Sequence, residues 1–283
     1  MGRFARSWEL TKASWQVLRA DKELLVLPVI SFVVTAVVAA SFFVPIFLLN
    51  SGTGDNGNGM SVGPLGWVFA FLGYVVLAYI TIFFNAALVS AANERMSGGD
   101  PTIGSALRGA AARGLVILPW AIVSASVSMV LRAIEQRSGI LGRIVAGIAG
   151  MAWSLVTFLV LPILVIEGVG VGEAIKRSTA MFKRTWGEQV IANAGIGVVS
   201  VVAILAGLPL LVLVATGVTP LVVLGVVAFV AWVGLVAVVA SALSVVYQTA
   251  LYRYAETGAV PAAFSSVDLH GAFRPKRGGH LTR

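Results

Sequence analysis

The sequence predicts an all-α integral membrane protein, a bundle of six transmembrane helices, and three observations support this fold class. Of the 283 residues, 58% are hydrophobic and only 11% are charged, whereas an average soluble domain carries roughly 25% charged residues. The apolar residues fall in blocks long enough to cross a hydrocarbon core about 30 Å thick. These blocks are too long and too uniformly apolar for barrel strands of about 10 alternating residues, and in lipid a helix pairs every backbone polar group within its own segment.

The six apolar blocks follow one another along most of the chain. They cover residues 24–49, 65–92, 115–131, 144–166, 190–216 and 221–247. The first block is too long for the apolar region of a cleaved signal peptide, so we interpret it as an uncleaved anchor. Only Gly217-Val-Thr-Pro220 separates the last two blocks, and so short a turn makes their helices antiparallel neighbours.

The third span is the shortest, at about 17 residues. Its length leaves open whether it crosses fully or forms a re-entrant pair with the fourth span. Several prolines also interrupt the apolar blocks, and each predicts a helix end or a kink because it lacks an N–H donor. They are Pro28, Pro45, Pro119, Pro162 and Pro209.

Lysine and arginine predict the orientation of the spans. Five lie before the first span, three after the second, four after the fourth and five in the tail, against three in the loop after the third. This bias places both termini in the cytoplasm. We therefore expect a membrane domain over residues 1–255 and a basic, flexible cytoplasmic tail over 256–283. The richness in Ala, Val and Gly suggests a high-GC bacterium, and thus a bacterial plasma membrane.

Three predicted cytoplasmic segments, 7–14, 104–111 and 172–179, resemble one another. Each has an aliphatic residue at its fourth position, a basic residue at its fifth or sixth, and small residues at its last two. Each also precedes a pair of spans. The pattern predicts three repeats of an interfacial helix plus a two-helix hairpin, arranged about an axis along the membrane normal.

Composition and motifs exclude many chemistries. The chain has no cysteine, so disulfides and thiolate chemistry are absent. It has no charged residue in the middle of a span, no phosphate-binding loop, no dinucleotide fingerprint and no nucleophile elbow. We therefore expect no enzyme, with no catalytic, cofactor-binding or metal-binding residues. The net charge of +8 follows from the cytoplasmic loops, so we expect no nucleic-acid partner.

Two groups of residues remain as candidate contacts. The segment around residues 172–186 is amphipathic, and such helices lie in the headgroup plane with cations at their rim. Its candidate anionic-lipid contacts are Lys176, Arg177, Lys183 and Arg184. The alternative is that it only braces the bundle. Candidate intramembrane polar contacts are Asn85, Asn193, Ser124 and Ser128. They either join helices by hydrogen bonds or line a polar pathway.

Several stretches of the sequence resemble a family of prokaryotic polytopic membrane proteins known only as a domain of unknown function. They are Phe4–Ser14, Asp21–Leu25, Pro28, Leu118–Ala121, Leu161–Gly168, Lys176–Ser178, Thr185–Glu188, Ala250–Ala255 and Ala272–Pro275. The resemblance covers nearly the whole chain and implies a membrane location, without an activity, substrate or catalytic residues.

We expect a non-enzymatic, lipid-interacting or scaffolding component of the membrane, with membrane lipids, including anionic ones, as partners and no protein partner specified. The alternative is a transporter or channel subunit with pseudo-threefold repeats, where three hairpins around an axis enclose a path. A third possibility, an enzyme acting on lipid headgroups, would need Glu167, Glu188 and a nearby donor facing a pocket.

Overall fold

The computed structural model describes residue 15 and residues 22–51, 64–137, 139–216 and 218–258. Side chains are described within these ranges except at 22–24, 43–51, 64–70, 137, 182–196, 198 and 214–216. All regular secondary structure of the described residues is helical, and turns or short loops connect the helices. The helices are α2 (Lys22–Ser51), α3 (Pro64–Met96), α4 (Ile103–Ala111), α5 (Gly114–Arg137), α6 (Gly139–Val156), α7 (Val160–Glu167), α8 (Val171–Ala206), the 3-10 helix η1 (Leu208–Thr216) and α9 (Thr219–Thr257).

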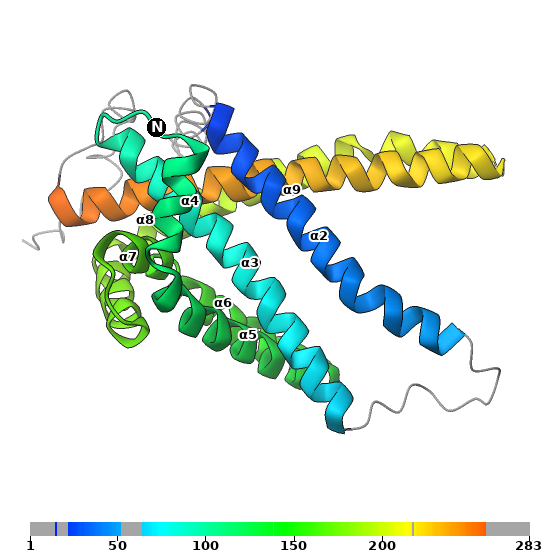
Figure 1. The fold of residues 1–283 in the computed structure, drawn as a ribbon, viewed down its shortest axis with the longest axis horizontal. Coiled ribbons are helices and arrows are strands. Elements are labelled where there is room, and N and C mark those ends of the chain that lie inside the picture. The colour runs from blue at the N-terminus through cyan, green and yellow to red at the C-terminus, as the bar shows by residue number, and fades with distance from the viewer. Residues whose placement is uncertain (1–14, 16–21, 52–63, 138, 217, 259–283) are drawn as a thin grey trace, which may run out of the picture.

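Among the described residues, three hairpin arms radiate from one common region (Figure 1). The arms are α2–α3, α5–α6, and α8 with η1 against α9. We call the common region the hub and define it as residues 86–120, 158–178 and 242–257. It contains the end of α3, all of α4, the start of α5, all of α7, the start of α8 and the end of α9.

The hub holds most of the buried core. The end of α3 is fully buried over Ala86–Val89, as are Val160, Ile163 and Leu164 of α7 and Tyr252 of α9. Small residues let the helices approach closely, as is usual in membrane bundles. At Gly109 of α4, an added Cβ would run into the Ser90 side chain of α3.

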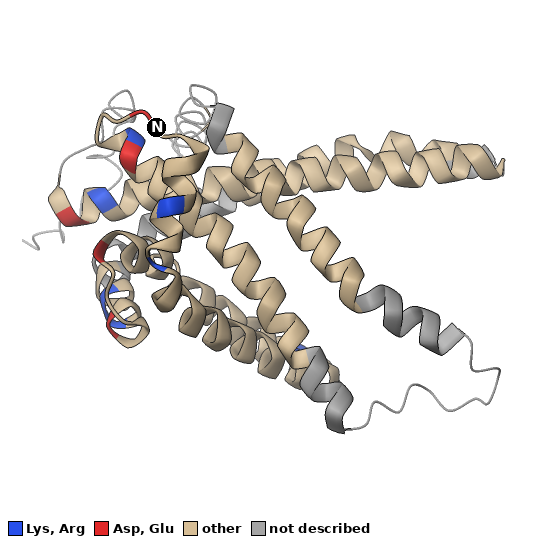
Figure 2. Ribbon diagram, viewed as in Figure 1, with Lys and Arg blue, Asp and Glu red and all other residues tan. Residues whose placement is uncertain are grey.

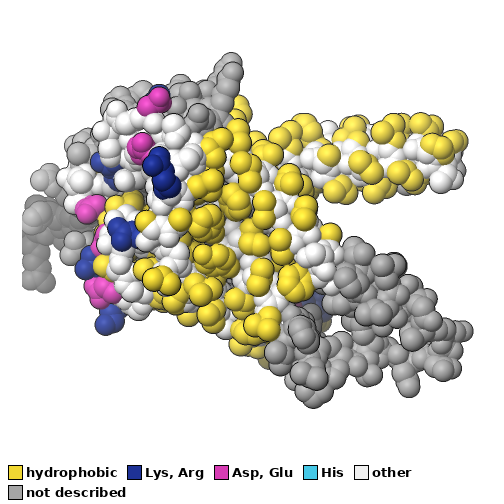
Figure 3. Space-filling model, viewed as in Figure 1, with side chains coloured by type: hydrophobic (Ala, Val, Ile, Leu, Met, Phe, Trp, Pro, Cys, Tyr) yellow, Lys and Arg dark blue, Asp and Glu magenta, His cyan; other side chains and the backbone are white. Residues whose placement is uncertain are grey.

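The arms, in contrast, expose large apolar side chains. Val37 of α2 is 64% exposed, Ile140 of α6 is 73% exposed and Val230 of α9 is 59% exposed. Figure 3 shows this apolar surface running along the arms, whereas Figure 2 shows charged residues gathered at the hub end. Soluble monomers rarely expose so continuous an apolar surface, so the arms have the surface of membrane-embedded helices.

Five helical stretches are long and apolar enough to cross a membrane. They are Leu25–Phe42, Phe71–Met96, Gly114–Gln136, Gly139–Glu167 and Thr219–Thr257. The predicted span 190–216 coincides instead with a shorter apolar stretch, Val199–Leu213. The structure thus supports an all-helical protein with five candidate membrane-spanning helices.

The third span is longer than its apolar block indicated. Helix α5 has 24 residues, which at 1.5 Å per residue is about 36 Å. It is therefore long enough to cross a membrane completely. The apolar block underestimates the helix because Arg132 and Glu135 continue the helix beyond the apolar residues.

The fourth span consists of two helices, because the chain turns at residues 157–159 between α6 and α7. Pro162 lies in the first turn of α7, where its missing N–H costs least. Pro209 lies in η1, just after α8 ends at Ala206. These two prolines mark helix ends as predicted, whereas α2 continues past Pro28 and Pro45, and α5 past Pro119.

The third repeat differs from the predicted unit of a separate interfacial helix and hairpin. Segment 172–179 is the start of α8, a single helix of 36 residues that continues into the arm. Gly187 is the only glycine or proline between residues 173 and 194, and one glycine in a helix interior costs only about 1 kcal/mol. The helix therefore has no strong stop signal between its interfacial and apolar parts.

Two of the three repeated segments nevertheless bury the same positions. Ala106 and Ala110 of α4 are 0% exposed, and so are Ala174 and Ser178 of α8. These are the third and seventh positions of their segments, four residues apart and thus on one helix face. The first segment, residues 7–14, lies outside the described residues.

The last of the described helices ends in a left-handed glycine. Helix α9 runs to Thr257 and is closed by Gly258, whose φ of 69° is left-handed. Glycine adopts this conformation without steric cost. The predicted tail beyond Gly258 lies outside the described residues.

Candidate functional site

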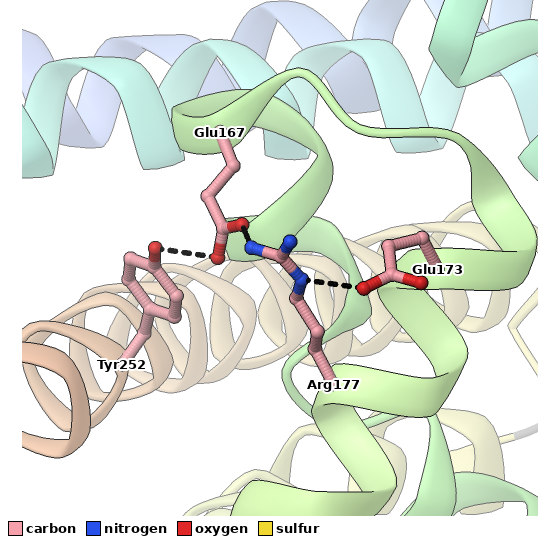
Figure 4. Close-up of polar contacts among 4 residues, drawn as sticks. All are labelled: Glu167, Glu173, Arg177 and Tyr252. Carbon is pink, nitrogen blue, oxygen red and sulfur yellow. Dashed lines mark hydrogen bonds and ion pairs between the residues drawn. The ribbon is translucent and has the colours of Figure 1, made fainter.

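Four side chains of the hub form a polar cluster, which we call the Glu167 cluster (Glu167, Glu173, Arg177 and Tyr252; Figure 4). The Tyr252 hydroxyl donates a hydrogen bond to Oε1 of Glu167 at 2.8 Å. Arg177 donates from Nη1 to Oε2 of Glu167 and from Nε to Oε1 of Glu173 at 2.9 Å. Both oxygens of Glu167 therefore accept a hydrogen bond.

The local sequence explains how these residues meet. Glu167 is the last residue of α7, and Gly168, with φ of 71°, ends the helix and donates its N–H to Leu164. Helix α8 begins three residues after Gly168, and places Glu173 and Arg177 four residues apart on one face. Tyr252 comes from the end of α9, so the cluster joins three helices.

The electrostatics of the cluster stabilise its charged forms. The hydrogen bond from Arg177 holds the pKa of the Glu173 carboxyl below its ordinary value. The hydrogen bond to Glu173 and the charge of Glu167 raise the pKa of Arg177. The Glu167 side chain is only 15% exposed, against 45% for Arg177 and 47% for Glu173. The part of the cluster screened from water is thus the Glu167 end.

Two further arginines bind the ends of helices from other parts of the chain. Nε of Arg113 donates to the Val165 carbonyl at 3.1 Å, near the end of α7. Nη1 of Arg253 donates to the Asn93 carbonyl at 3.0 Å and to the Ser97 hydroxyl, at the end of α3. The last carbonyls of a helix lack partners within it, and a cation there also offsets the helix dipole.

Consecutive residues of α9 thus bind the ends of two different helices. Tyr252 reaches the end of α7, and Arg253 reaches the end of α3. Glu94 of α3 accepts a hydrogen bond from Ser105 of α4 at 2.8 Å. Ser105 and Thr102 also form a capping box at the start of α4. These hydrogen bonds join α9 to the ends of α3 and α7, and α4 to the end of α3.

The predicted anionic-lipid contacts have different surroundings. Lys176 is exposed on α8, whereas the Arg177 guanidinium is bound to Glu167 and Glu173. Lys183, Arg184 and Glu188 belong to helix α8, but the structure does not describe their side chains. Among the described residues, no three His, Asp or Glu side chains gather into a group that could hold a metal ion.

The predicted intramembrane polar contacts are dispersed. Asn85 of α3 accepts a hydrogen bond from Ser241 of α9 at 3.4 Å, a contact between two arms. Ser124 and Ser128 are half-buried in α5. The Asn193 side chain is outside the described residues. The structure therefore pairs Asn85, which the sequence predicted as a polar contact, with Ser241, which it did not.

Sequence reasoning missed Tyr252, Arg113, Arg253 and Ser178 as structural contacts. The arginines had been counted only for their bias toward one side of the membrane. The sequence does contain a signal for one ion pair, because Glu173 and Arg177 lie four residues apart, the spacing of an ion pair on a helix. The partners of Tyr252 and Arg253 were not readable, since they lie 85 and 160 residues away in sequence.

The fold and the hub define an all-helical protein with the apolar arms of a multi-pass membrane protein. The family described as "Family of unknown function (DUF6159)" matches residues 64–262, more than half of the chain, and the chain belongs to this family. This confirms the predicted membership of a domain family of unknown function. No curated protein and no solved structure matches the chain.

Proposed function

We propose that the protein is a non-enzymatic, lipid-interacting scaffold that crosses the bacterial plasma membrane six times, with both termini in the cytoplasm. The observation that carries the proposal is the separation of charge and apolar surface. The hub gathers charged side chains at one end, the arms between are apolar, and the α5–α6 tip carries the exposed Arg132, Glu135 and Arg143. Charge at two ends with apolar surface between fits a chain that spans a bilayer.

In this proposal the predicted fifth span, 190–216, is the outer part of α8 together with η1. These elements pack against α9 as the predicted hairpin does, and they include the apolar stretch Val199–Leu213. The three arms then correspond to the three predicted pairs of spans. The shared burial of Ala106 with Ala174 and of Ala110 with Ser178 supports the repeat.

The proposed lipid contact is the basic side of α8 at the hub. Lys176 is exposed there, and position 183 lies two turns further along the same continuous helix, on the same face. Arg184 follows beside it. Arg177 is not among the proposed lipid contacts, because its guanidinium is already bound by two carboxylates. An amphipathic helix with a basic rim binds anionic headgroups in this way.

Native mass spectrometry tests the lipid contact. Lys176→Glu, Lys183→Glu and Arg184→Glu together should reduce the anionic lipid that remains bound, because each cation near the surface contributes about 1 kcal/mol, roughly fivefold in affinity. The matched control is Arg143→Glu at the tip of α6, which should leave retention at the hub unchanged. Equal retention by the triple variant and the unmodified protein would rule out this contact.

One observation favours the second candidate function, a transporter or channel subunit. The fourth span is broken between α6 and α7, and discontinuous spans occur at the substrate sites of transporters. Against it, Asn85 pairs with Ser241 across two arms, as expected for a contact between helices. Cysteines introduced at Ser124 and Ser128 separate the two candidates, because only a polar pathway makes them react with a water-soluble maleimide.

The proposal that the protein is not an enzyme rests on the Glu167 cluster. Glu167 would be the acid or base of the third possibility, and both of its oxygens accept hydrogen bonds from Tyr252 and Arg177. A carboxylate held in this way acts as a joint between helices. Glu167→Gln should then lower the stability of the hub. The phospholipids of a proteoliposome should stay chemically unchanged with this variant and with the unmodified protein. Turnover of headgroups by the unmodified protein would contradict this reading.

A further inference from the structure

The break in the fourth span is held by a side chain from another helix. Helix α6 ends at Val156 and α7 begins at Val160. Ser178 of α8, which is 0% exposed, donates to the Val156 carbonyl at 2.6 Å and accepts from the Leu159 N–H at 3.2 Å. The backbone groups that the break removes from the helical ladder thus find partners in the hub, as buried polar groups require.

The neighbouring helix of the same arm has a weak point at the same level. Pro119 lies inside α5, where it cannot donate to the carbonyl of Leu115, four residues earlier. The next residue, Trp120, stacks on Trp153 of α6, with ring centroids 5.9 Å apart. The Trp153 carbonyl accepts the backbone N–H of Thr157, the first residue of the break, at 2.9 Å. The stacked rings therefore place Pro119 of α5 close in depth to the break, which begins one turn after Trp153.

Burial changes sharply across this level. On the hub side, Val160, Ile163 and Leu164 of α7 are 0% exposed. On the arm side, Ile140 and Ile148 of α6 are 73% and 66% exposed. A segment with few buried contacts opens at lower free energy than one embedded in the core. The inner half of the span is therefore enclosed by the core, whereas the outer half packs on α5 and α8 and presents its remaining apolar side chains at the surface.

Among the described residues, one cation–ring contact joins the outer part of the arm to the next arm. The Arg132 guanidinium of α5 lies over the Tyr74 ring of α3, 5.8 Å from its centroid. A cation over an aromatic ring at this distance is attracted by about 0.5–1 kcal/mol at an exposed site. Such a contact is strong enough to bias the position of an arm and weak enough to open.

We propose that the α5–α6 arm is a movable element that pivots on the hub, with hinges at Pro119 and at residues 157–159. Ser178 keeps the second hinge attached to the hub, and Arg132 over Tyr74 defines the closed position. Pivoting separates the outer parts of α5 and α3 and opens apolar surface between them toward lipid. The device does not depend on the proposed lipid contact at α8.

Distances between spin labels in proteoliposomes test the pivot, and the absence of native cysteine means that only introduced cysteines are labelled. The pair Ile140→Cys and Gly172→Cys joins the arm tip to the hub. The reference pairs are Val130→Cys with Ile140→Cys within the arm, and Gly172→Cys with Glu256→Cys within the hub. We expect narrow distance distributions for both references and a broader one between tip and hub. A distribution between tip and hub as narrow as the references would overturn the proposal.

Two variants in the tip-to-hub pair identify the hinge and the closing contact. Arg132→Gln should broaden the tip-to-hub distribution further, because it removes the cation from the Tyr74 ring and with it the contact that holds the arm closed. Pro119→Ala should narrow the distribution, because alanine restores the missing donor in α5. The matched control is Ser126→Ala, whose hydroxyl bonds only the Ile122 carbonyl of its own helix among the described contacts. If both variants give the control's distribution, the assigned hinge and contact are wrong.

Discussion

Gly207 and Trp232 show how single residues set the distance between two helices. The Gly207 N–H donates to the Ile204 carbonyl at 2.9 Å, three residues back, as α8 tightens toward η1. The indole N–H of Trp232 in α9 then donates to the Ala203 carbonyl at 2.8 Å. A Cβ on residue 207 would run into the Trp232 ring, so only glycine allows this approach.

We therefore expect Gly207→Ala to destabilise the α8–α9 arm. Overpacking a close contact costs about 1–3 kcal/mol, and unfolding in detergent followed by tryptophan fluorescence should show the loss. The matched control is Gly197→Ala, because a Cβ there has no neighbour within 4 Å among the described residues. Alanine should stabilise that helix position slightly. Equal effects at the two glycines would contradict the packing argument.

Among the elements, α4 and the start of α8 use the same face to pack against the other helices of the hub. Both bury small residues at the third and seventh positions of their segments, Ala106 with Ala110 and Ala174 with Ser178. Small side chains there let the helix backbones approach the ends of the preceding spans. The correspondence of buried positions, more than the degenerate sequence match, supports the proposed structural equivalence of the two segments.

The equivalence predicts equal sensitivity to larger side chains. Ala106→Leu and Ala174→Leu should each lower the free energy of unfolding by about 1–3 kcal/mol, because neither site has room for added carbons. Ala111→Leu and Ala180→Leu, at exposed positions of the same two helices, should have little effect. Thermal unfolding in one detergent compares all four, and a tolerant Ala106 beside a sensitive Ala174 would refute the shared docking mode.

For the whole molecule, the distribution of charge supports our proposal that the two ends lie on opposite sides of the membrane. Among the described side chains, the hub carries cations from segments predicted to be cytoplasmic, and the α5–α6 tip carries Arg132 and Arg143, which are predicted to lie outside. Desolvating a charge in hydrocarbon is costly. Our proposal therefore places the hub and the tip in different aqueous phases.

Labelling of single cysteines tests this orientation. In intact cells, an impermeant maleimide should react with Ile140→Cys at the tip and not with Gly172→Cys at the hub, while both react after permeabilisation. The chain has no cysteine of its own to interfere. Reaction of both residues from the same side would exclude a fully crossing α5–α6 arm.

The sequence alone was sufficient for the helical class, most of the spans and the one-sided charge. Each of these depends on local composition, since a long apolar block must become a helix in lipid to pair its backbone groups. The helix ends near Pro162 and Pro209 were local signals as well. The continuous α8 was not predicted, because a short amphipathic motif does not show whether the helix stops after it.

Only the tertiary structure decided which residues meet at the hub. Arg113 reaches Val165, 52 residues away, and Arg253 reaches Asn93, 160 residues away. A chain read by itself shows that these arginines lie near span ends, which fits many arrangements of the arms. Their partners are fixed by how the helices pack, because a hydrogen bond of about 3 Å requires a geometry that sequence spacing does not specify between distant helices.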